Sequence, residues 1–256
     1  MIYAALRDAL AASQPVSLAT IIDGVGVGGK LLVGPDREPL GGLGHDELDR
    51  VVTRDALGEL EHGRSGVRHY GTEGQQRETA VTVFIESFAP PPLMLVFGAV
   101  DFTKALAEAA KVVGYKVIVA DAREVFATTK RFPMADEVIV SWPDGVFDRF
   151  TLTPRDAVCI LTHDTKFDVP AVVRALETDV GYIGVMGSRR THEKRVERLR
   201  EVGVDDAGLA KLMAPIGIDI GSRTPEETAV SILAEIIAVR SGRDVPQLRD
   251  GEGSIH

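Results

Sequence analysis

The chain has 256 residues, an apolar content of 45% and a formal net charge of −9 at pH 7. This length suits one large or two small domains, at about 150 residues each, and the apolar content is ample for a packed core. The acidic balance argues against general binding to nucleic acid or to a membrane surface, because both need basic patches. The apolar runs are too short to span a bilayer, and residues 1–15 lack the basic start of a signal peptide. We therefore expect a cytoplasmic protein.

The cysteine and histidine content restricts the metal chemistry. The one cysteine, Cys159, excludes an internal disulfide framework and any metal site built from several cysteines. It lies inside an apolar run, where a buried and unreactive thiol is strongly favoured. The histidines other than His163 show no metal-ligand spacing with acids or cysteine. We assign no metal site and no catalytic residue.

Residues 1–89 predict a small α+β domain. We expect helices over 4–12 and 45–62, and strands over 16–22, 31–33, 67–70 and 79–88. The glycine-rich segment 24–29 predicts a hairpin turn between the first two strands. An anion site there is the less favoured interpretation. Pro90-Pro91-Pro92 ends this domain, because three prolines continue neither a strand ladder nor a helix.

The stretch Leu93–Asp121 predicts the start of a second domain, over residues 93–241. Two runs that are apolar at every position, Leu93–Phe97 and Val117–Ala120, flank a helical pattern that Gly114 ends. Such runs are typical of parallel strands covered on both faces, and strand, helix and strand in about 30 residues form a right-handed βαβ unit. The predicted fold class is α/β, a Rossmann-like parallel sheet domain preceded by the small α+β domain.

The remaining elements follow in alternation. We expect a helical turn within 123–130, strands over 135–140, 157–161 and 182–186, a turn over 141–145, helices from 168, over 191–202 and over 207–213, an extended segment over 215–221 and a last helix over 225–240. In the helix 191–202, Arg195 is expected on the outer, charged face. The last helix begins with a capping box of Thr224 and Glu227. Residues 242–256 are expected to form a polar tail.

The turn after the first strand of the sheet is the first candidate site. A dinucleotide site has glycines at its first, third and sixth positions, where this chain has Gly98, Val100 and Thr103. The Cβ of Val100 would obstruct a pyrophosphate, and Asp101 would add negative charge where a phosphate binds at a helix start. Asp121 is spaced suitably for a ribose hydroxyl. A Rossmann-type sheet that does not bind NAD in the usual way is at least as well supported as one that does.

The ends of two further strands form the second candidate site. Their polar segments contain Thr162, His163 and Asp164 in one, and Gly187, Ser188, Arg189 and Arg190 in the other. Both should open on one crevice, because the carboxyl ends of parallel strands share an edge. Exposed glycine and serine amides beside two arginines are typical of a phosphate or oxyanion cradle, and His163 is suited to donating a proton or binding a ligand, with Asp164 orienting it. For each residue alone, a helix cap or a solvated face is slightly favoured over a functional role. Their convergence at adjacent strand ends favours function.

The third candidate is Asp219, the single acid in the extended segment 215–221. Its neighbours are apolar residues and glycines, so we expect Asp219 to be buried or directed at a partner. Arg223 is one such partner. A structural Asp–Arg pair and a ligand contact are about equally well supported.

Three long motifs carry a resemblance to a known family. They are Leu161-Thr162-His163-Asp164, the segment Gly181–Thr191 (GYIGVMGSRRT) and the segment Pro215–Glu227 (PIGIDIGSRTPEE), with Phe132-Pro133 and Ala135-Asp136 as a shorter match. They closely resemble the C-terminal Rossmann domain of the XdhC/CoxI family over roughly residues 93–241. Family members are accessory proteins of xanthine and carbon monoxide dehydrogenases.

The resemblance implies an accessory factor rather than an enzyme. It would bind the molybdenum cofactor, as molybdopterin or its nucleotide form, and assist its sulfuration or its insertion into a molybdenum hydroxylase apo-enzyme. A cysteine desulfurase is a further expected partner, and a homodimer is left open. The implied cofactor-binding residues are Gly98, Asp101, Asp121, Arg123, Thr162, His163, Asp164, Gly187, Ser188, Arg189, Arg190 and Asp219. The phosphate would lie at Gly187–Arg190, the ribose at Asp121, and the metal end near His163 and Asp164.

Two departures from the family pattern keep alternatives open. The family usually has Gly-Ala-Gly-His in the first sheet turn, where this chain has Gly98-Ala99-Val100-Asp101. The family's N-terminal domain usually carries Gly-Gly-Cys, where Gly41-Gly42-Leu43-Gly44 has no cysteine, so a persulfide role is not carried over. The alternatives are an NAD(P)-binding oxidoreductase, which the missing glycines disfavour, and a scaffold or regulatory paralogue that has lost its ligand.

Overall fold

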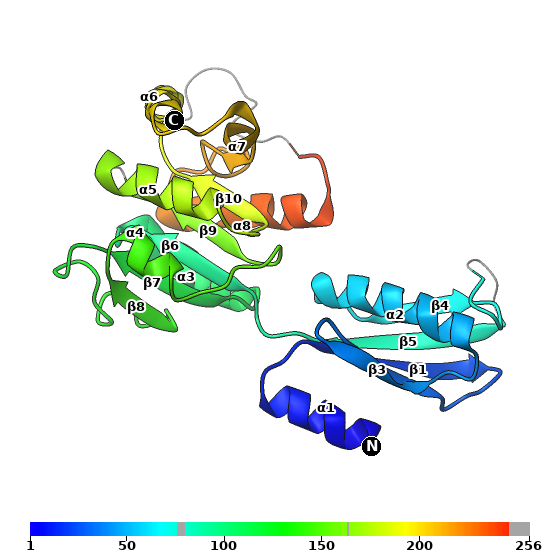
Figure 1. Ribbon diagram of the computed structural model, residues 1–256. Coiled ribbons are helices and arrows are strands. Elements are labelled where there is room, and N and C mark those ends of the chain that lie inside the picture. The colour runs from blue at the N-terminus through cyan, green and yellow to red at the C-terminus, as the bar shows by residue number, and fades with distance from the viewer. Residues whose placement is uncertain (76–79, 163, 246–256) are drawn as a thin grey trace. The chain divides into compact units, whose positions relative to one another are not determined.

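The computed structural model describes residues 1–75, 80–162 and 164–245. The chain divides into two compact units, Met1–Pro90 and Pro91–His256 (Figure 1). Among the described residues, no helix combines the length and the apolar character needed to cross a membrane. The predicted polar tail lies, from residue 246 on, outside the described residues, as does His163.

The first unit is an antiparallel sheet with a helix on each face. Its strands are β1 (Val16–Gly24), β2 (Lys30–Gly34), β3 (Arg37–Gly42), β4 (Gly66–Tyr70) and β5 (Val81–Phe88), in the order β3-β2-β1-β5-β4. The helices are α1 (Ile2–Ala11) and α2 (Asp46–Glu61). Alternate residues of β1 face opposite ways: Ile21 packs in the core under α2, and Val16 packs against α1 (Figure 1). This α+β unit agrees with the predicted fold class.

The sequence did not predict β3. Its residues Arg37–Gly42 contain Pro39 and two glycines, which have low β propensity. The strand forms at the edge of the sheet, where one side needs no pairing and a proline is tolerated.

The second unit is a six-stranded, fully parallel sheet. The strands are β6 (Leu93–Phe97), β7 (Lys116–Asp121), β8 (Glu137–Val140), β9 (Ala157–Ile160), β10 (Tyr182–Val185) and β11 (Leu212–Met213), in the order β11-β10-β9-β6-β7-β8. This is the doubly wound strand order of a Rossmann sheet. The order in which successive strands are added reverses between β6 and β9, which is the switch point of the sheet. The predicted Rossmann-like parallel sheet is confirmed.

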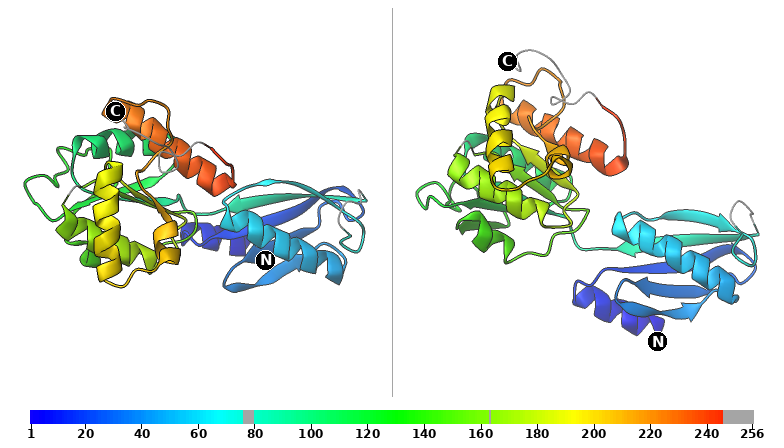
Figure 2. Two further views of the ribbon diagram at one scale, coloured as in Figure 1. Left: turned by 90° about the horizontal axis from the view of Figure 1, so that it is seen from above. Right: turned by 45° about the horizontal axis from the view of Figure 1, so that its top comes forward.

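Helices cover both faces of this sheet. They are α3 (Asp101–Val112), α4 (Pro143–Phe147), α5 (Thr165–Leu176), α6 (Arg189–Glu201), α7 (Asp206–Ala210) and α8 (Pro225–Ser241). The ribbon views show helices on either side of the strands (Figure 2). Leu106 of α3 and Ile232 of α8 pack with Val96 on one face, and Phe147 of α4 packs with Phe97 on the other. Because neighbouring residues of β6 enter different cores, the strand must be apolar at every position.

Several predicted boundaries of the second unit are wrong. The segment 141–145, expected as a turn, leads into α4, whose Pro143 occupies the first helical turn, where a missing N–H costs nothing. Helix α5 begins at Thr165 rather than 168, because Asp164 caps it. The expected helix over 207–213 is α7 followed by β11. The helical turn expected within 123–130 is present as a single turn, in which Ala127 N donates to Arg123 O at 3.1 Å. The capping box of Thr224 and Glu227 is confirmed.

Candidate functional site

The first glycine turn joins β6 to α3 at the switch point of the sheet. Gly98 has φ +109°, and a Cβ on it would lie 2.8 Å from the backbone nitrogen of Thr162 at the end of β9. The hydroxyl of Thr103 donates to the Gly98 carbonyl. Glycine is needed here because the ends of β6 and β9 approach closely. The protein's own backbone therefore occupies the space beside Gly98.

Asp121 at the end of β7 is saturated with hydrogen bonds. Its Oδ2 accepts from Ala99 N at 2.8 Å and from Arg123 Nη2 at 2.7 Å, and its Oδ1 accepts from Arg123 N and Nε, both at 2.9 Å. Burial alone would raise the pKa of Asp121, but the hydrogen bonds from Arg123 and the Ala99 amide outweigh it and lower the pKa. A carboxylate has about four acceptor positions, so a ribose hydroxyl would have to displace one of these donors.

The polar residues after β9 lie beside Arg123. Thr162 is buried, and its Oγ1 accepts from Asp164 N at 3.0 Å. Asp164 is exposed and caps α5 by accepting from Lys166 N at 3.0 Å. The pKa of Arg123 is raised, first by its hydrogen bond to Asp121 and to a smaller degree by the charge of Asp164. The structure therefore brings the ends of β7 and β9 into electrostatic contact; the predicted role of His163 lies outside the described residues.

The second glycine turn joins β10 to α6. Gly187 has φ +144°, and Ser188 caps α6 by accepting from Thr191 N at 3.2 Å. Arg190 is exposed and Arg189 is half-buried, and the first turn of α6 contains no acidic residue. Positive charge and helix-start amides therefore occur together at this turn, as an anion site requires.

A buried ion pair lies directly behind this second turn. Nη2 of Arg195 donates to Asp168 Oδ2 at 3.1 Å and to the carbonyl of Met186 at 2.9 Å, and both charged side chains are 1% exposed. Burial raises the pKa of Asp168 to about 6, against the lowering effect of Arg195. The expected outer position of Arg195 is wrong. The arginine instead fixes the carbonyl that precedes Gly187, a contact that helical periodicity gave no reason to expect.

The segment 215–221 runs past the end of β10. Ile216 N donates to Val185 O at 3.1 Å, and Gly217 N donates to the carboxylate of Glu235 at 2.8 Å. Asp219 itself is exposed, so its predicted burial is wrong, and in the described ranges no ion pair joins it to Arg223. The glycines and the Glu235 contact fix the backbone and leave the Asp219 side chain in solvent.

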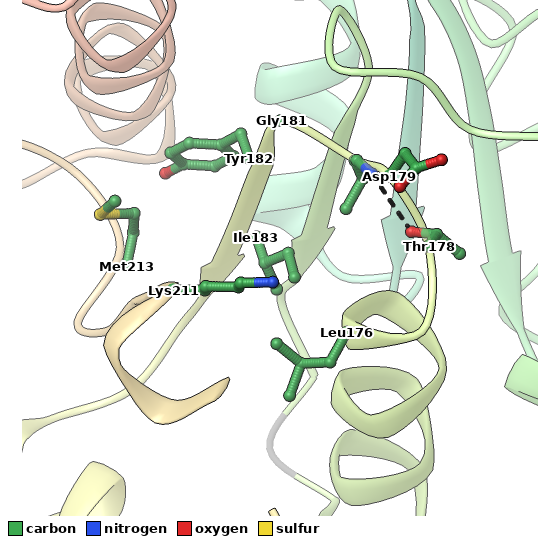
Figure 3. A pocket seen from close by; sticks show the side chains of 9 residues that line it. Leu176, Thr178, Asp179, Gly181, Tyr182, Ile183, Lys211 and Met213 are labelled. Atoms are coloured by element: carbon green, nitrogen blue, oxygen red, sulfur yellow. Dashed lines mark hydrogen bonds between the residues drawn. The ribbon is translucent and has the colours of Figure 1, made fainter. Parts of the chain in front are cut away.

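Among the described residues, two cavities lie toward opposite ends of the parallel strands. One, of about 260 Å³, opens beside the start of α3 and is lined by Val100, Asp101, Lys104, Lys130, Arg131 and Phe132. The other, of about 380 Å³, lies at the amino end of β10 and is lined by Leu176, Thr178, Asp179, Val180, Gly181, Tyr182, Ile183, Lys211 and Met213 (Figure 3). The first was missed from the sequence because Lys104 and Lys130 belong to separate elements. The second lies away from the strand ends discussed above.

The described residues give little scope for metal ligation by the chain itself. Among them, no group of three His, Cys, Asp or Glu side chains is placed to hold a metal ion. Cys159 is buried in β9, and burial raises the pKa of its thiol far above the ordinary value. Leu43, in the segment where a family cysteine usually falls, is buried in the core of the first unit.

Comparison with known proteins identifies the family. Residues 94–236 match the XdhC Rossmann domain, and residues 9–71 match the XdhC and CoxI family. The chain belongs to the XdhC and CoxI family. The two matched regions fall in the parallel unit and in the antiparallel unit, respectively.

Curated relatives extend beyond the length of this XdhC/CoxI chain. It is 28% identical over 239 residues to the uncharacterized protein YqeB of Escherichia coli, covering 89% of the chain and 44% of that protein. It is 32% identical over 163 residues to a probable xanthine dehydrogenase subunit of Bacillus subtilis, and the match covers 64% of the chain and 47% of that protein. It is 37% identical over 84 residues to the molybdenum cofactor insertion chaperone PaoD of Escherichia coli, and the match covers 33% of the chain and 26% of that protein. The chain thus spans less than half the length of each of these relatives.

A solved structure shares the fold. The crystal structure of a xanthine dehydrogenase from Bacillus halodurans superposes with a TM-score of 0.53 at 22% sequence identity, and the match covers 94% of this chain and 96% of that one. At this level of identity the likeness concerns the fold alone.

Proposed function

We propose that this XdhC/CoxI chain binds the molybdenum cofactor, as a pterin nucleotide, at the carboxyl edge of its parallel sheet. It then assists sulfuration of the cofactor or its insertion into a molybdenum hydroxylase such as xanthine or carbon monoxide dehydrogenase. Family membership and the likeness to a molybdenum cofactor insertion chaperone support this role. The observation that carries the proposal is the Gly187–Arg190 turn, where a capped helix start with two arginines, and with no acidic residue in its first turn, follows the end of β10.

The residues divide the work of binding. The amides of the Gly187–Arg190 turn and its arginines hold the phosphate, and Arg195 keeps that turn in place from behind. Arg123, anchored by Asp121 but 51% exposed, presents its remaining donors to the ligand. We assign Thr162, Gly98 and Asp101 to the adjoining part of the site and Asp219 to its outer part. Asp164 is assigned to the metal end of the cofactor, as is His163, which lies outside the described residues.

This assignment changes the role predicted for Asp121. A ribose contact would compete with Ala99 N and Arg123 for the same four acceptor positions. We assign Asp121 to orienting Arg123 and to fixing the first turn. The bound cofactor supplies the molybdenum redox chemistry of the recipient enzyme, and the chain's own residues bind and orient it. The proposed partners are the apo-hydroxylase and a cysteine desulfurase; a homodimer is compatible with this role.

Direct binding tests the proposal. The purified full chain is titrated with purified cofactor, and the cofactor content of the partner hydroxylase is measured with and without the gene. Saturable binding together with a cofactor-poor hydroxylase in the deletion strain is the expected result. No binding and an unchanged hydroxylase would contradict the proposal.

The second candidate is a scaffold that assembles with the hydroxylase without holding its cofactor. The closed Gly98 turn and the leucine in the Gly41–Gly44 motif favour this alternative over an NAD(P)-dependent oxidoreductase. A scaffold predicts that Arg189→Ala leaves hydroxylase maturation intact. An oxidoreductase predicts a saturable fluorescence change on titration with NADH, which a closed Gly98 turn should prevent.

A further inference from the structure

The cavity beside the start of α3, which we call the lysine cavity, has a positive lining in a strongly acidic chain. Lys104 comes from the first turns of α3, and Lys130 and Arg131 come from the segment after β7. The one acid among the lining residues is Asp101, so three cations face a single carboxylate in a chain of net charge −9. Like charges brought to one cavity repel each other unless an anion lies between them.

The two lysines are not used to stabilise the fold. Within the described ranges, neither Lys104 nor Lys130 makes an ion pair or a side-chain hydrogen bond, and both are exposed. Lys111 on the same helix behaves differently: its ammonium binds both carboxylate oxygens of Asp136, at 2.7 and 2.8 Å. The ammonium groups of the lysine cavity therefore remain available to a ligand.

Arg131, in contrast, is already held in position. Its Nη1 donates to the carbonyls of Ala99 at 3.1 Å and of Phe126 at 3.3 Å, and its guanidinium lies 5.4 Å from the Phe132 ring centre. Nη2 lies 3.7 Å from Asp101, whose side chain is 90% exposed. An anchored guanidinium loses little conformational entropy on binding, so the cavity combines one fixed cation with two adaptable ones.

We propose that the lysine cavity binds a phosphoryl or diphosphate group of a small-molecule ligand. A compact polyanion brings several negative charges to the three cations, whereas a carboxylate brings only one. The volume of about 260 Å³ suits such a group and not a folded partner. The inference goes beyond the cofactor proposal, because its three cations, Lys104, Lys130 and Arg131, are not assigned to the cofactor and because it is tested with an inorganic probe.

The test is calorimetric titration of the full chain with inorganic diphosphate at low ionic strength. Saturable binding is expected, and Lys104→Ala and Lys130→Ala should each weaken it about fivefold, as for an exposed charge contact of about 1 kcal/mol. Lys211→Ala is the matched control, because Lys211 lines the separate cavity at the amino end of β10. It should leave binding unchanged.

A substitution that is expected to tighten binding distinguishes loss of the site from loss of folding. Asp101→Asn removes the one acid that lines the cavity and should tighten binding about threefold, which a damaged fold would not produce. Absence of saturable binding, equal weakening by Lys211→Ala, or weaker binding by Asp101→Asn would each overturn the proposal.

Cofactor titration separates this inference from the proposed function. Diphosphate binding that depends on Lys104 and Lys130, without cofactor binding, retains the lysine cavity and rejects the cofactor role. Cofactor binding together with no diphosphate binding retains the role and rejects the cavity.

Discussion

Gly98 follows β6 and Gly187 follows β10, and each turn leads a strand of the same parallel sheet into a helix. Around Gly98 the space is filled: a Cβ would lie 2.8 Å from Thr162 N, and Asp121 accepts the neighbouring Ala99 amide. Around Gly187 a Cβ would meet only side chains, at 3.2 Å from Thr191 and 3.5 Å from Arg195. At the first turn the protein's own backbone and Asp121 fill the space beside the glycine. The second turn leads into a helix start that carries basic side chains.

The difference shows that a glycine at a strand end has two separate uses. At Gly98 it lets two strands approach, and an internal carboxylate takes the donor that a phosphate would otherwise accept from. At Gly187 it shapes a turn that an internal arginine holds from behind. Anion binding to helix-start amides is therefore expected at the second turn, although the first occupies the usual dinucleotide position. The lysine cavity beside the first turn is proposed to bind through side chains instead.

Gly98→Ala should have the largest effect on stability. Strain at φ +109° and the overlap with Thr162 N together predict a loss of about 3 kcal/mol in the free energy of unfolding. Gly187→Ala should cost about 1–2 kcal/mol, because the backbone strain remains but the neighbours are side chains. Urea denaturation of both variants measures this, and equal losses would remove the distinction between the turns.

Arg195→Met tests the support behind the second turn. It leaves Asp168 buried without its cation and should cost about 3 kcal/mol at pH 8, whereas Arg198→Met on the exposed face of α6 should cost less than about 0.5 kcal/mol. The pKa of Asp168 is already raised from 3.8 to about 6, so its stabilising contribution is full below pH 3.8 and is lost as pH rises through 6.

Loss of Arg195 raises the pKa of Asp168 further. The deficit of Arg195→Met relative to the unsubstituted chain should therefore grow between pH 4 and pH 8, as measured by denaturation at each pH. A deficit that is independent of pH would show that Arg195 does not affect the pKa of Asp168.

Asp121→Asn should show the opposite pH dependence at the first turn. The pKa of Asp121 is lowered, so its contribution is present at neutral pH and is lost as pH falls through the folded-state pKa. We expect a loss of about 2 kcal/mol at pH 7 that shrinks towards pH 3. A loss that persists undiminished at pH 3 would mean that the lost stability does not depend on the charge of Asp121, which would contradict this prediction.

Much of the sheet could be predicted from the sequence. Runs such as Leu93–Phe97 are apolar at every position because both faces are covered, and periodicity detects that directly. The strands β3 and β11 were missed, since one contains proline and two glycines and the other has only two residues. Their pairing is decided by neighbours distant in the chain.

The side-chain contacts of the site were less predictable. Spacing placed Asp121 at a strand end but could not reveal that Arg123 and Ala99 fill its acceptor positions. Arg195 appeared to belong to a solvated face, because helical periodicity does not show which charged residue meets the buried Asp168. Such contacts depend on how helices pack on the sheet.

The central claim is that the Gly187–Arg190 turn holds the phosphate of the cofactor. Its most direct test is equilibrium binding of purified molybdenum cofactor to the full chain and to two single variants, Arg190→Ala and Arg198→Ala. Both remove an exposed arginine from α6, one at its start and one in its last turn. We predict about tenfold weaker binding for Arg190→Ala and less than about twofold weaker binding for Arg198→Ala; equal affinities for both variants and the unsubstituted chain would contradict the account.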